Sequence, residues 1–320
     1  MAWPFRSARP ATTGRAPRAP GPRRGRWGFA EGAEIAPGRH VLGRLGGGSR
    51  YEVYLAWDEA LFALVVAKIL RPGAVGDARA REELRREASL VERLAHPCLV
   101  RGFGAVLDGA YPHVVLEHVE GPTLHRLVER SGPAAMEQLL PLALHVAAVL
   151  HHLAGRGVVH LDVKPANVVM SAPPRLIDLS VARSVEEART LRVPIGTDAY
   201  MAPEQCLPGP DAPPIGPAAD VWALGATLFH AAAGRPPFPR RPEAARSADA
   251  PTRFPQLVRA PEPLGDRVPA AVSELVRRML ARDPAARPSA REVVEALEPL
   301  VAAVPDRLAR TRRGLLVPPR

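Results

Sequence analysis

The hydrophobic pattern of this chain changes character near Gly121, and this change constrains the fold more than any other feature. From His40 to Gly121 the pattern is that of short strands separated by turn residues, with one helical segment at about 77–94. Beyond Gly121 the apolar residues have mostly helical spacing. A small sheet with one helix, followed by a larger helical region, predicts an α+β fold with two lobes, at about 38–116 and 120–302.

The two ends of the chain differ in composition from the middle. Residues 1–33 are rich in Pro, Arg, Ala and Gly and have no helical or strand period, so we expect them to be disordered. Residues 303–320 form a basic tail. Because the ends hold much of the formal charge of +10, this charge is weak support for a nucleic-acid partner. We expect the Arg-rich tails to bind anionic surfaces only as an accessory role. Salt would weaken such binding steeply.

The number of cysteines and the length of the apolar runs indicate the cellular compartment of the protein. Two cysteines, Cys98 and Cys206, cannot form a disulfide framework. No apolar run approaches the roughly 18 residues that span a bilayer, and no apolar stretch follows the Arg23-Arg24 pair. We therefore expect a cytoplasmic protein with no transmembrane segment, secretory signal or appended sensor domain.

A series of motifs extends over about 38–302. In chain order they read "LGGGSRYEVYLA", "VVAK", "HLDVKPAN", "IDLS", "GTDAYMAPEQ", "ADVWALG" and "DPAARPS". In this order and spacing the series resembles the eukaryotic-type protein kinases, of the Ser/Thr rather than the Tyr type and with a bacterial character. Small-molecule phosphotransferases share the H-x-D-x₄-N pattern but lack the later motifs. The resemblance implies a two-lobed kinase-like fold, with an antiparallel sheet and one helix in the N-terminal lobe. It also implies ATP and Mg²⁺, or Mn²⁺ in its place.

The glycine-rich turn and its neighbours form the implied nucleotide site. A strand–glycine turn–strand hairpin lets backbone N–H groups approach phosphates closely, although alone this segment is more typical of an ordinary hairpin. The hinge from Glu117 to Val119 would offer backbone hydrogen bonds, next to the gating residue Leu116. The other residues that the resemblance assigns to the nucleotide are Leu45, Gly46, Gly48, Val53, Ala67 and Val169.

Lys68 and Glu87 are an implied ion pair. Lys68 ends the "VVAK" segment and resembles the strand lysine that holds the α and β phosphates of ATP. Glu87 follows 19 residues later on the predicted helix. Without Lys68, Glu87 would be interpreted as a solvated charge on the helix surface. Because Lys68 lies at this spacing from Glu87, we favour an ion pair between the two.

The "HLDVKPAN" and "IDLS" motifs carry the implied chemistry. Asp162 would orient the substrate hydroxyl and accept its proton, and Lys164 would neutralise the transferring phosphoryl group. Asn167 and Asp178 would hold the metal ion, since Mg²⁺ prefers hard oxygen ligands.

The scarcity of lysine and asparagine supports this assignment. Among 43 Lys and Arg residues only Lys68 and Lys164 are lysines, and Asn167 is the only asparagine. Lysine is a compact charge that fits among phosphate oxygens, where the planar Arg fork needs a different geometry. Random placement would put both lysines on the two lysine positions of the family in roughly one of 900 trials, by a crude estimate.

Three further residues have implied scaffold roles. Thr197 would bond to the catalytic Asp and Lys, Glu204 would form a buried pair with Arg287, and Asp220 would hold the catalytic-loop backbone.

The chain also departs from the family pattern, and these departures leave a second function open. Tyr51 stands where the third glycine belongs, and Leu179 and Ser180 replace the usual Phe and Gly. Leu161 replaces the Arg that grips a phosphorylated activation loop, so we expect activity to depend weakly on phosphorylation of Ser184 or Thr190. The leading hypothesis is an active Ser/Thr protein kinase that also phosphorylates itself. The alternative is a pseudokinase that binds nucleotide or partner proteins as a scaffold.

Overall fold

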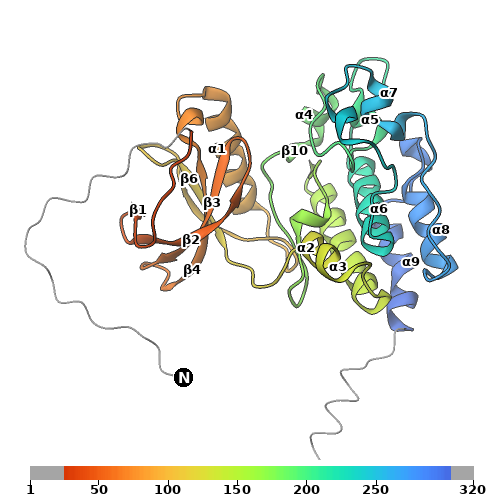
Figure 1. The fold of residues 1–320 in the computed structure, drawn as a ribbon, viewed down its shortest axis with the longest axis horizontal. Coiled ribbons are helices and arrows are strands. Elements are labelled where there is room, and N and C mark those ends of the chain that lie inside the picture. The colour runs from red at the N-terminus through yellow and green to blue at the C-terminus, as the bar shows by residue number, and fades with distance from the viewer. Residues whose placement is uncertain (1–24, 304–320) are drawn as a thin grey trace, which may run out of the picture.

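The computed structural model describes residues 25–303, which form two lobes (Figure 1). The N-terminal lobe is a six-stranded sheet of order β1-β2-β3-β4-β6-β5 together with helix α1, and every strand pairing in this sheet is antiparallel. Its elements are β1 (Glu34–Ala36), β2 (Arg39–Gly47), β3 (Tyr51–Asp58), β4 (Ala63–Leu70), α1 (Ala78–Arg93), β5 (Gly102–Val106) and β6 (His113–Glu117).

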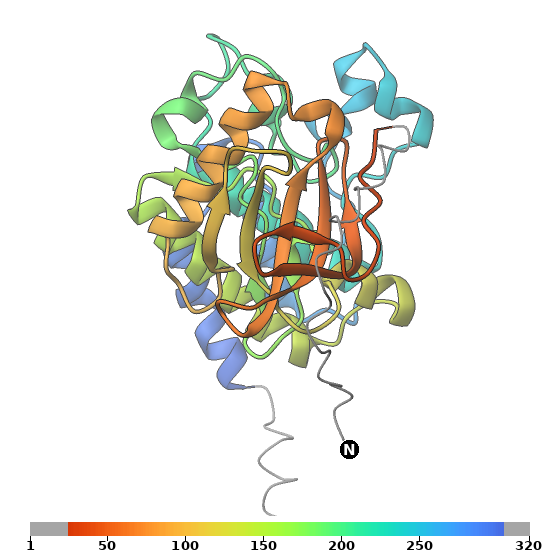
Figure 2. The same cartoon turned by 90° about the vertical axis from the view of Figure 1, so that its left-hand side faces the viewer.

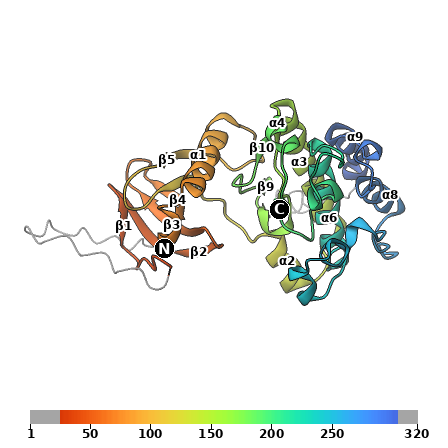
Figure 3. The ribbon, with the colours of Figure 1, turned by 90° about the horizontal axis from the view of Figure 1, so that it is seen from above.

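The C-terminal lobe is mainly helical, with two small two-stranded sheets. Its helices are α2 (Leu124–Ser131), α3 (Met136–Gly155), α4 (Val185–Arg189), α5 (Pro203–Cys206), α6 (Pro217–Ala233), α7 (Ala250–Arg253), α8 (Ala270–Met279) and α9 (Ala290–Ala302). Its strands are β7 (Val158–Val159), β8 (Val168–Val169), β9 (Arg175–Leu176) and β10 (Arg183–Ser184). Figure 3 shows from above that the lobes occupy opposite ends of the molecule. The predicted fold class is confirmed.

Strand alternation divides the sheet into two faces. In the β3–β4 ladder Val53 lies opposite Lys68, and Tyr54 lies opposite Ala67. Residues directly opposite share a face, and neighbours along a strand point to opposite faces. The inner face, which carries Lys68, packs against α1. The outer face carries Tyr54 and Ala67. Figure 2 shows the sheet of the N-terminal lobe in front of the C-terminal lobe.

Helix α1 is placed by a cap and an apolar stripe. The Asp77 side chain accepts the backbone N–H of Arg79 at 2.9 Å, which satisfies a donor that the first turn leaves free. Leu84 and Val91 are buried at helical spacing and join the main core together with Leu70 of β4. Glu87 is buried on the same helix. Packing of the apolar stripe thus carries a carboxylate into the interior.

Helix α3 is the core helix of the C-terminal lobe. It packs against α6 and α9. It is also the one described helix long and apolar enough to cross a membrane, with a mean hydropathy of 1.3, but half of that window is buried inside the protein. The prediction that no apolar run approaches this length was therefore wrong for α3. Its packing accounts for its composition as that of a core helix.

Residues 25–33 pack on the outer face of the sheet, contrary to the predicted disorder of 1–33. Trp27 donates its backbone N–H to Glu52 at 2.9 Å and its indole N–H to the Leu70 carbonyl at 2.7 Å. Phe29 contacts Tyr54 edge-on, with ring centroids 5.4 Å apart. Two aromatic rings give this part of the segment enough apolar surface to offset the entropy of ordering it. Residues 1–24 of that segment, and 304–320 of the basic tail, lie outside the described residues.

Candidate active site

Lys68 lies at the centre of a buried charge cluster. Its Nζ is 2.8 Å from Glu87 Oε1 and 2.7 Å from Asp178 Oδ1. Burial opposes the charged form of Lys68, but the carboxylates of Asp178 and Glu87 outweigh it and hold the lysine pKa above its ordinary value. The predicted Lys68–Glu87 pair is therefore present, and the lysine keeps its charge.

Asp178 follows β9 with an uncommon backbone conformation. Its φ is 73°, in the left-handed region that non-glycine residues seldom adopt. Burial would raise its pKa, but Lys68 and the Ser180 N–H hold the pKa well below the usual range. Backbone strain of this kind persists where surrounding contacts impose it. Here it accompanies an ionised carboxylate directed at the sheet lysine.

Asp162 has one engaged and one free carboxylate oxygen. Its Oδ2 accepts hydrogen bonds from Lys164 Nζ at 2.7 Å and from Asn167 Nδ2 at 3.3 Å. Its Oδ1 is buried and has no hydrogen-bond partner among the described residues. A buried acceptor left unpaired costs about 1–3 kcal/mol, and more when it is charged. This oxygen is therefore suited to receive a ligand hydroxyl.

Lys164 and Asn167 stabilise this carboxylate from two sides. Lys164 Nζ also lies 2.7 Å from Thr197 Oγ1, which is one of the two contacts that the resemblance implied for Thr197. The other, to Asp162, is not formed among the described residues. Asn167 donates a second hydrogen bond from Nδ2, at 2.9 Å, to the Asp162 backbone carbonyl. With both donations made by Nδ2, the carboxamide oxygen of Asn167 faces away from Asp162 and is available as a metal ligand.

Asp220 holds the backbone of the catalytic loop from α6. Its two carboxylate oxygens accept the N–H groups of His160 and Leu161 at 2.7 and 2.8 Å. Leu161, the residue before Asp162, has a φ of 65°, so its backbone is strained as that of Asp178 is. The scaffold role expected of Asp220 is confirmed by these contacts.

Gly196 and Gln205 attach the "GTDAYMAPEQ" segment, which resembles the end of a kinase activation segment, to the "HLDVKPAN" motif, which resembles a kinase catalytic loop. Gly196 has a φ of 124°, and a Cβ at this position would lie 2.6 Å from the Leu161 carbonyl oxygen. Gln205 Nε2 donates to the carbonyls of Leu161 and Ile195, both at 3.1 Å. Sequence reasoning missed the role of Gln205, because nothing near it in the chain signals a carbonyl 44 residues away.

Glu204 and Arg287 form the buried pair that the resemblance implied. Arg287 donates through both terminal nitrogens to the two carboxylate oxygens of Glu204, at 2.7 and 2.8 Å. Both side chains are almost fully buried. Arg287 also donates to the Ala218 carbonyl at 2.9 Å, which joins the end of the activation segment to the start of α6.

In the glycine turn, Gly47 is the residue whose backbone conformation requires a glycine. Gly47 has a φ of 146°, and a Cβ there would lie 2.5 Å from the Tyr51 carbonyl oxygen. Nothing lies within 4 Å of the Cβ positions of Gly46 and Gly48, so both leave open space for a ligand. The N–H of Gly48 closes the hairpin onto Tyr51 at 3.0 Å.

Tyr51, the residue that replaces the third family glycine, turns toward α1. It is buried in the main core, and its ring lies 4.9 Å from Lys68 Nζ. Its hydroxyl is buried without a hydrogen-bond partner in the described part of the chain. The Tyr51 ring therefore packs beside Lys68 rather than over the glycine turn.

The assignment of Ala67 to the nucleotide was wrong by one residue. Ala67 is fully buried in the outer-face cluster with Ile35, Val41 and Tyr54. Val66 shares the inner face with Lys68, because it lies two residues earlier on β4. We therefore place Val66, rather than Ala67, on the face that a nucleotide would contact.

The remaining predicted nucleotide residues lie around the connection between the lobes. Val169 pairs with Thr123, and Leu116 lies opposite Val66 on the inner face. The Glu117 side chain binds Arg101 at 3.1 Å and Arg175 at 3.3 Å, so it is already engaged. The Glu117 backbone N–H also donates to the Arg101 carbonyl at 2.9 Å, so hydrogen bonds to a base would use the other backbone groups of the Glu117–Val119 hinge. Leu45 is exposed on β2, and Val53 faces the same side as Lys68.

The donor set fits a divalent cation that takes most of its ligands from phosphate and water. Among residues 25–303 no group of three or more His, Cys, Asp or Glu side chains could hold a metal. Mg²⁺ is typically bound through one or two carboxylates plus substrate phosphates, not by an all-protein cage. Asp178 and Asn167 match that arrangement.

Comparison with known proteins places these features in one family. The pattern of the protein kinase domain matches residues 39–297. A probable serine/threonine-protein kinase of Corynebacterium efficiens is 33% identical over 211 residues, which are 62% of this chain and 31% of that protein. PknB of Mycobacterium tuberculosis is 32% identical over 212 residues, 62% of this chain and 33% of that protein. PkwA of Thermomonospora curvata, a probable serine/threonine-protein kinase, is 31% identical over 268 residues, 82% of this chain and 34% of that protein. The chain spans about a third of the length of these relatives.

Proposed function

This chain belongs to the protein kinase family, and from that premise we propose that it is an active serine/threonine kinase. It transfers the γ-phosphoryl group of ATP to Ser or Thr hydroxyls of proteins, its own included. The family implies ATP and a divalent metal, and we assign Mg²⁺ with Mn²⁺ as an alternative.

The observation that carries this proposal is the free oxygen of Asp162. Oδ1 is buried and unpartnered among the described residues, while Oδ2 is held by Lys164 and Asn167. A carboxylate oriented in this way can accept a hydrogen bond from a substrate hydroxyl and then its proton. General-base assistance of this kind contributes about 10²–10⁴-fold in rate.

The other residues supply positioning and charge. Lys68 would bind the α and β phosphates and is itself held by Glu87. Asn167 and Asp178 would hold the metal, which when bound supplies positive charge beside the phosphates. Lys164 lies beside Asp162 and would neutralise charge on the transferring group.

The reaction step is an in-line displacement. The substrate oxygen forms a bond to the γ-phosphorus as the bond from that phosphorus to the β–γ bridging oxygen breaks. ADP departs with the bonding electron pair, and the hydroxyl proton moves to Asp162 Oδ1. Most of the catalytic effect comes from positioning and charge neutralisation, since the protein forms no covalent bond to the substrate.

The residues that favour the pseudokinase alternative leave this geometry intact. Leu179 is fully buried in the core, and Leu161 is held by Asp220. Ser180 donates its backbone N–H to Asp178 Oδ1 at 3.2 Å. None of these contacts removes a group that would touch metal, phosphate or the substrate hydroxyl.

The test compares Asp162→Asn with Asp108→Asn in a phosphate-transfer assay with Mg·ATP. Asp108 is a matched control because its side chain is 87% exposed. We expect the first change to lower the rate by about 100-fold or more and the second to leave it unchanged. Equal rates in wild type and Asp162→Asn, or no transfer by wild type, would support the scaffold alternative. Calorimetric titration with Mg·ATP would then show whether nucleotide binding survives, and the assay without added substrate measures self-phosphorylation.

A further inference from the structure

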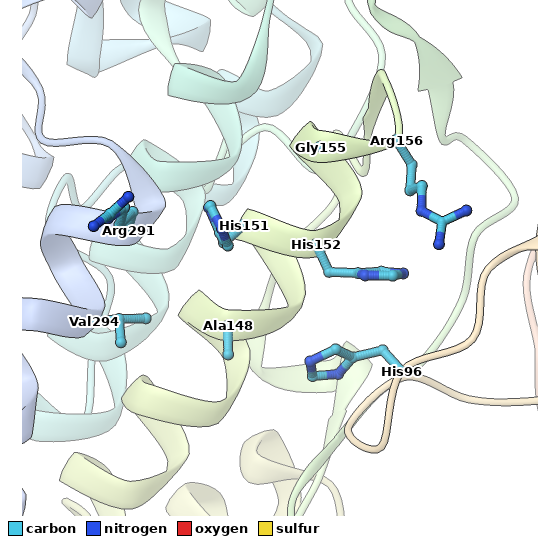
Figure 4. Close-up of a pocket in the computed structure, with 8 residues that line it drawn as sticks. All are labelled: His96, Ala148, His151, His152, Gly155, Arg156, Arg291 and Val294. Atoms are coloured by element: carbon cyan, nitrogen blue, oxygen red, sulfur yellow. The ribbon is translucent and has the colours of Figure 1, made fainter.

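A second cavity lies in the C-terminal lobe, apart from the proposed active site. It has a volume of about 480 Å³ and shares no lining residue with that site. Its walls come from the end of α3, from α9 and from the loop that joins α1 to β5 (Figure 4). His151 lies on the side of α3 that faces Arg291 of α9, and His152 lies on the side that faces His96.

The lining of this cavity has only one sign of charge. Its titratable side chains are all basic: His96, His151, His152, Arg156 and Arg291. Within the described part of the chain no carboxylate lines it. Arg291 is partly neutralised by Glu295, at 2.8 Å on the next turn of α9.

Two imidazole rings, those of His96 and His152, lie at one end of the cavity and have ring nitrogens that could bind a ligand. The rings of His96 and His152 lie 5.4 Å apart between centroids. His96 Nδ1 accepts the Cys98 N–H at 3.1 Å, so the neutral ring carries its proton on Nε2. His152 Nε2 is buried and has no hydrogen-bond partner among the described residues. His152 lines the cavity, and its Nε2 has no protein partner in the described part of the chain that would compete with a ligand.

We propose that this cavity binds a phosphate-type oxyanion, held by His96, His152 and Arg156. Phosphate accepts several hydrogen bonds and favours arginine and imidazolium donors. The volume exceeds that of one phosphate group and lies in the range of small-molecule sites. A monoester could therefore place its organic part against Ala148 and Val294. A metal ion is a poor fit, because two arginine cations line the same cavity and no described cluster has three metal-ligating side chains.

Binding should strengthen as the pH falls. Burial lowers the pKa of His96 and of His152, and neighbouring basic groups lower both further. An anion beside the two rings would favour their protonated forms and raise both pKa values. The titratable and charged groups that act on the two rings are His145 and His151 of α3, Arg156 after it and Arg175 of β9. On the other side of α3, Arg291 of α9 lines the cavity with Glu295 as its partner. All but Glu295 are basic, so an incoming anion meets little competition from a resident carboxylate.

The experiment follows the histidine ring signals by ¹H–¹⁵N NMR in two pH titrations, one in inorganic phosphate and one in sodium chloride at matched ionic strength. A titration with phosphate at pH 6.5 measures the affinity. We expect phosphate, but not chloride, to raise the apparent pKa of His96 and His152 by about 0.5 or more. Arg156→Gln should weaken the phosphate affinity by at least about fivefold, whereas Arg267→Gln, an exposed arginine elsewhere in the lobe, should not change it.

Equal shifts with phosphate and chloride, or unchanged affinity in Arg156→Gln, would overturn the proposal. A parallel titration with phenyl phosphate identifies the source of the anion. Tighter binding than inorganic phosphate assigns the cavity to a phosphomonoester, and equal or weaker binding assigns it to the free ion.

Discussion

Lys68 Nζ lies 2.7 Å from Asp178 Oδ1, although 110 positions separate the two residues in the sequence. Lys68 belongs to the sheet of the N-terminal lobe, and Asp178 follows a strand of the C-terminal lobe. The same ammonium group contacts Glu87 of α1 at 2.8 Å. One buried cation therefore links the sheet, the helix and the carboxylate that we propose binds the metal.

Glu87→Gln tests whether the charge of this helix residue matters. The amide keeps the size of the side chain and an acceptor for Lys68 but removes the negative charge that anchors the lysine. We expect kcat/KM for ATP to fall by about tenfold or more, which is about 1.4 kcal/mol in transition-state stabilisation. Glu82→Gln, on the exposed side of the same helix, is the control for steady-state kinetics. Equal effects of the two changes would contradict the role of the buried pair.

Arg287→Met should destabilise the fold strongly. It leaves Glu204 as a buried carboxylate without its partner, and breaking such a pair costs about 3–5 kcal/mol. Urea unfolding measures this free energy. Arg277→Gln removes an exposed pair with Glu274 and should leave the free energy of unfolding nearly unchanged.

Adding Glu204→Gln to Arg287→Met should recover part of the loss, because the uncompensated charge is then absent. A double variant that is less stable than Arg287→Met alone would argue against this explanation.

His113 should make stability depend on pH. It is fully buried, donates from Nδ1 to the Tyr111 carbonyl at 2.6 Å and accepts from Arg39 at 2.8 Å. Burial lowers its pKa to about 4, and the cation of Arg39 adds to this. An unfolded chain protonates this histidine below about pH 6.5, but the folded protein does so only near pH 4.

The contribution of His113 is therefore present above about pH 6.5 and is lost as the pH falls toward 4, by up to about 3 kcal/mol. Urea unfolding at pH 7.5 and pH 5 should show a smaller loss in His113→Gln than in wild type. The glutamine cannot titrate but still offers a donor and an acceptor. Identical pH dependence in the two proteins would refute the assignment.

Alanine at both Ser184 and Thr190 should lower kinase activity by less than tenfold. Leu161 replaces the arginine that would grip a phosphorylated segment, and α4 already contacts α1 through Glu187 and Arg86 at 3.5 Å. Ser184 Oγ caps α4 by accepting the Glu187 N–H at 3.1 Å, so a stability loss of about 1 kcal/mol is expected from the missing cap. Activity assays below the melting range separate the two effects. A larger fall in activity at full folding would mean that phosphorylation of these residues controls the kinase.

Side chains with specific chemistry could be identified from the sequence, but the face of a strand could be misassigned. Lys68, Asp162 and Asn167 stood out because few other residue types serve phosphate, proton transfer and metal at that spacing. Ala67 was misassigned because strand side chains alternate, so an error of one residue exchanges the inner face for the outer one.

The sequence by itself determined the order of elements and the α+β class, because these follow from hydrophobic period. It determined the residue types of the candidate site through the resemblance of its motifs to those of the protein kinases. Only the tertiary structure decided that Trp27 packs on the sheet, that Gln205 holds the catalytic loop and that Asp162 keeps one oxygen free. Each of these depends on groups far apart in the chain. Burial and hydrogen-bond partners arise only when such segments meet, so no local pattern records them.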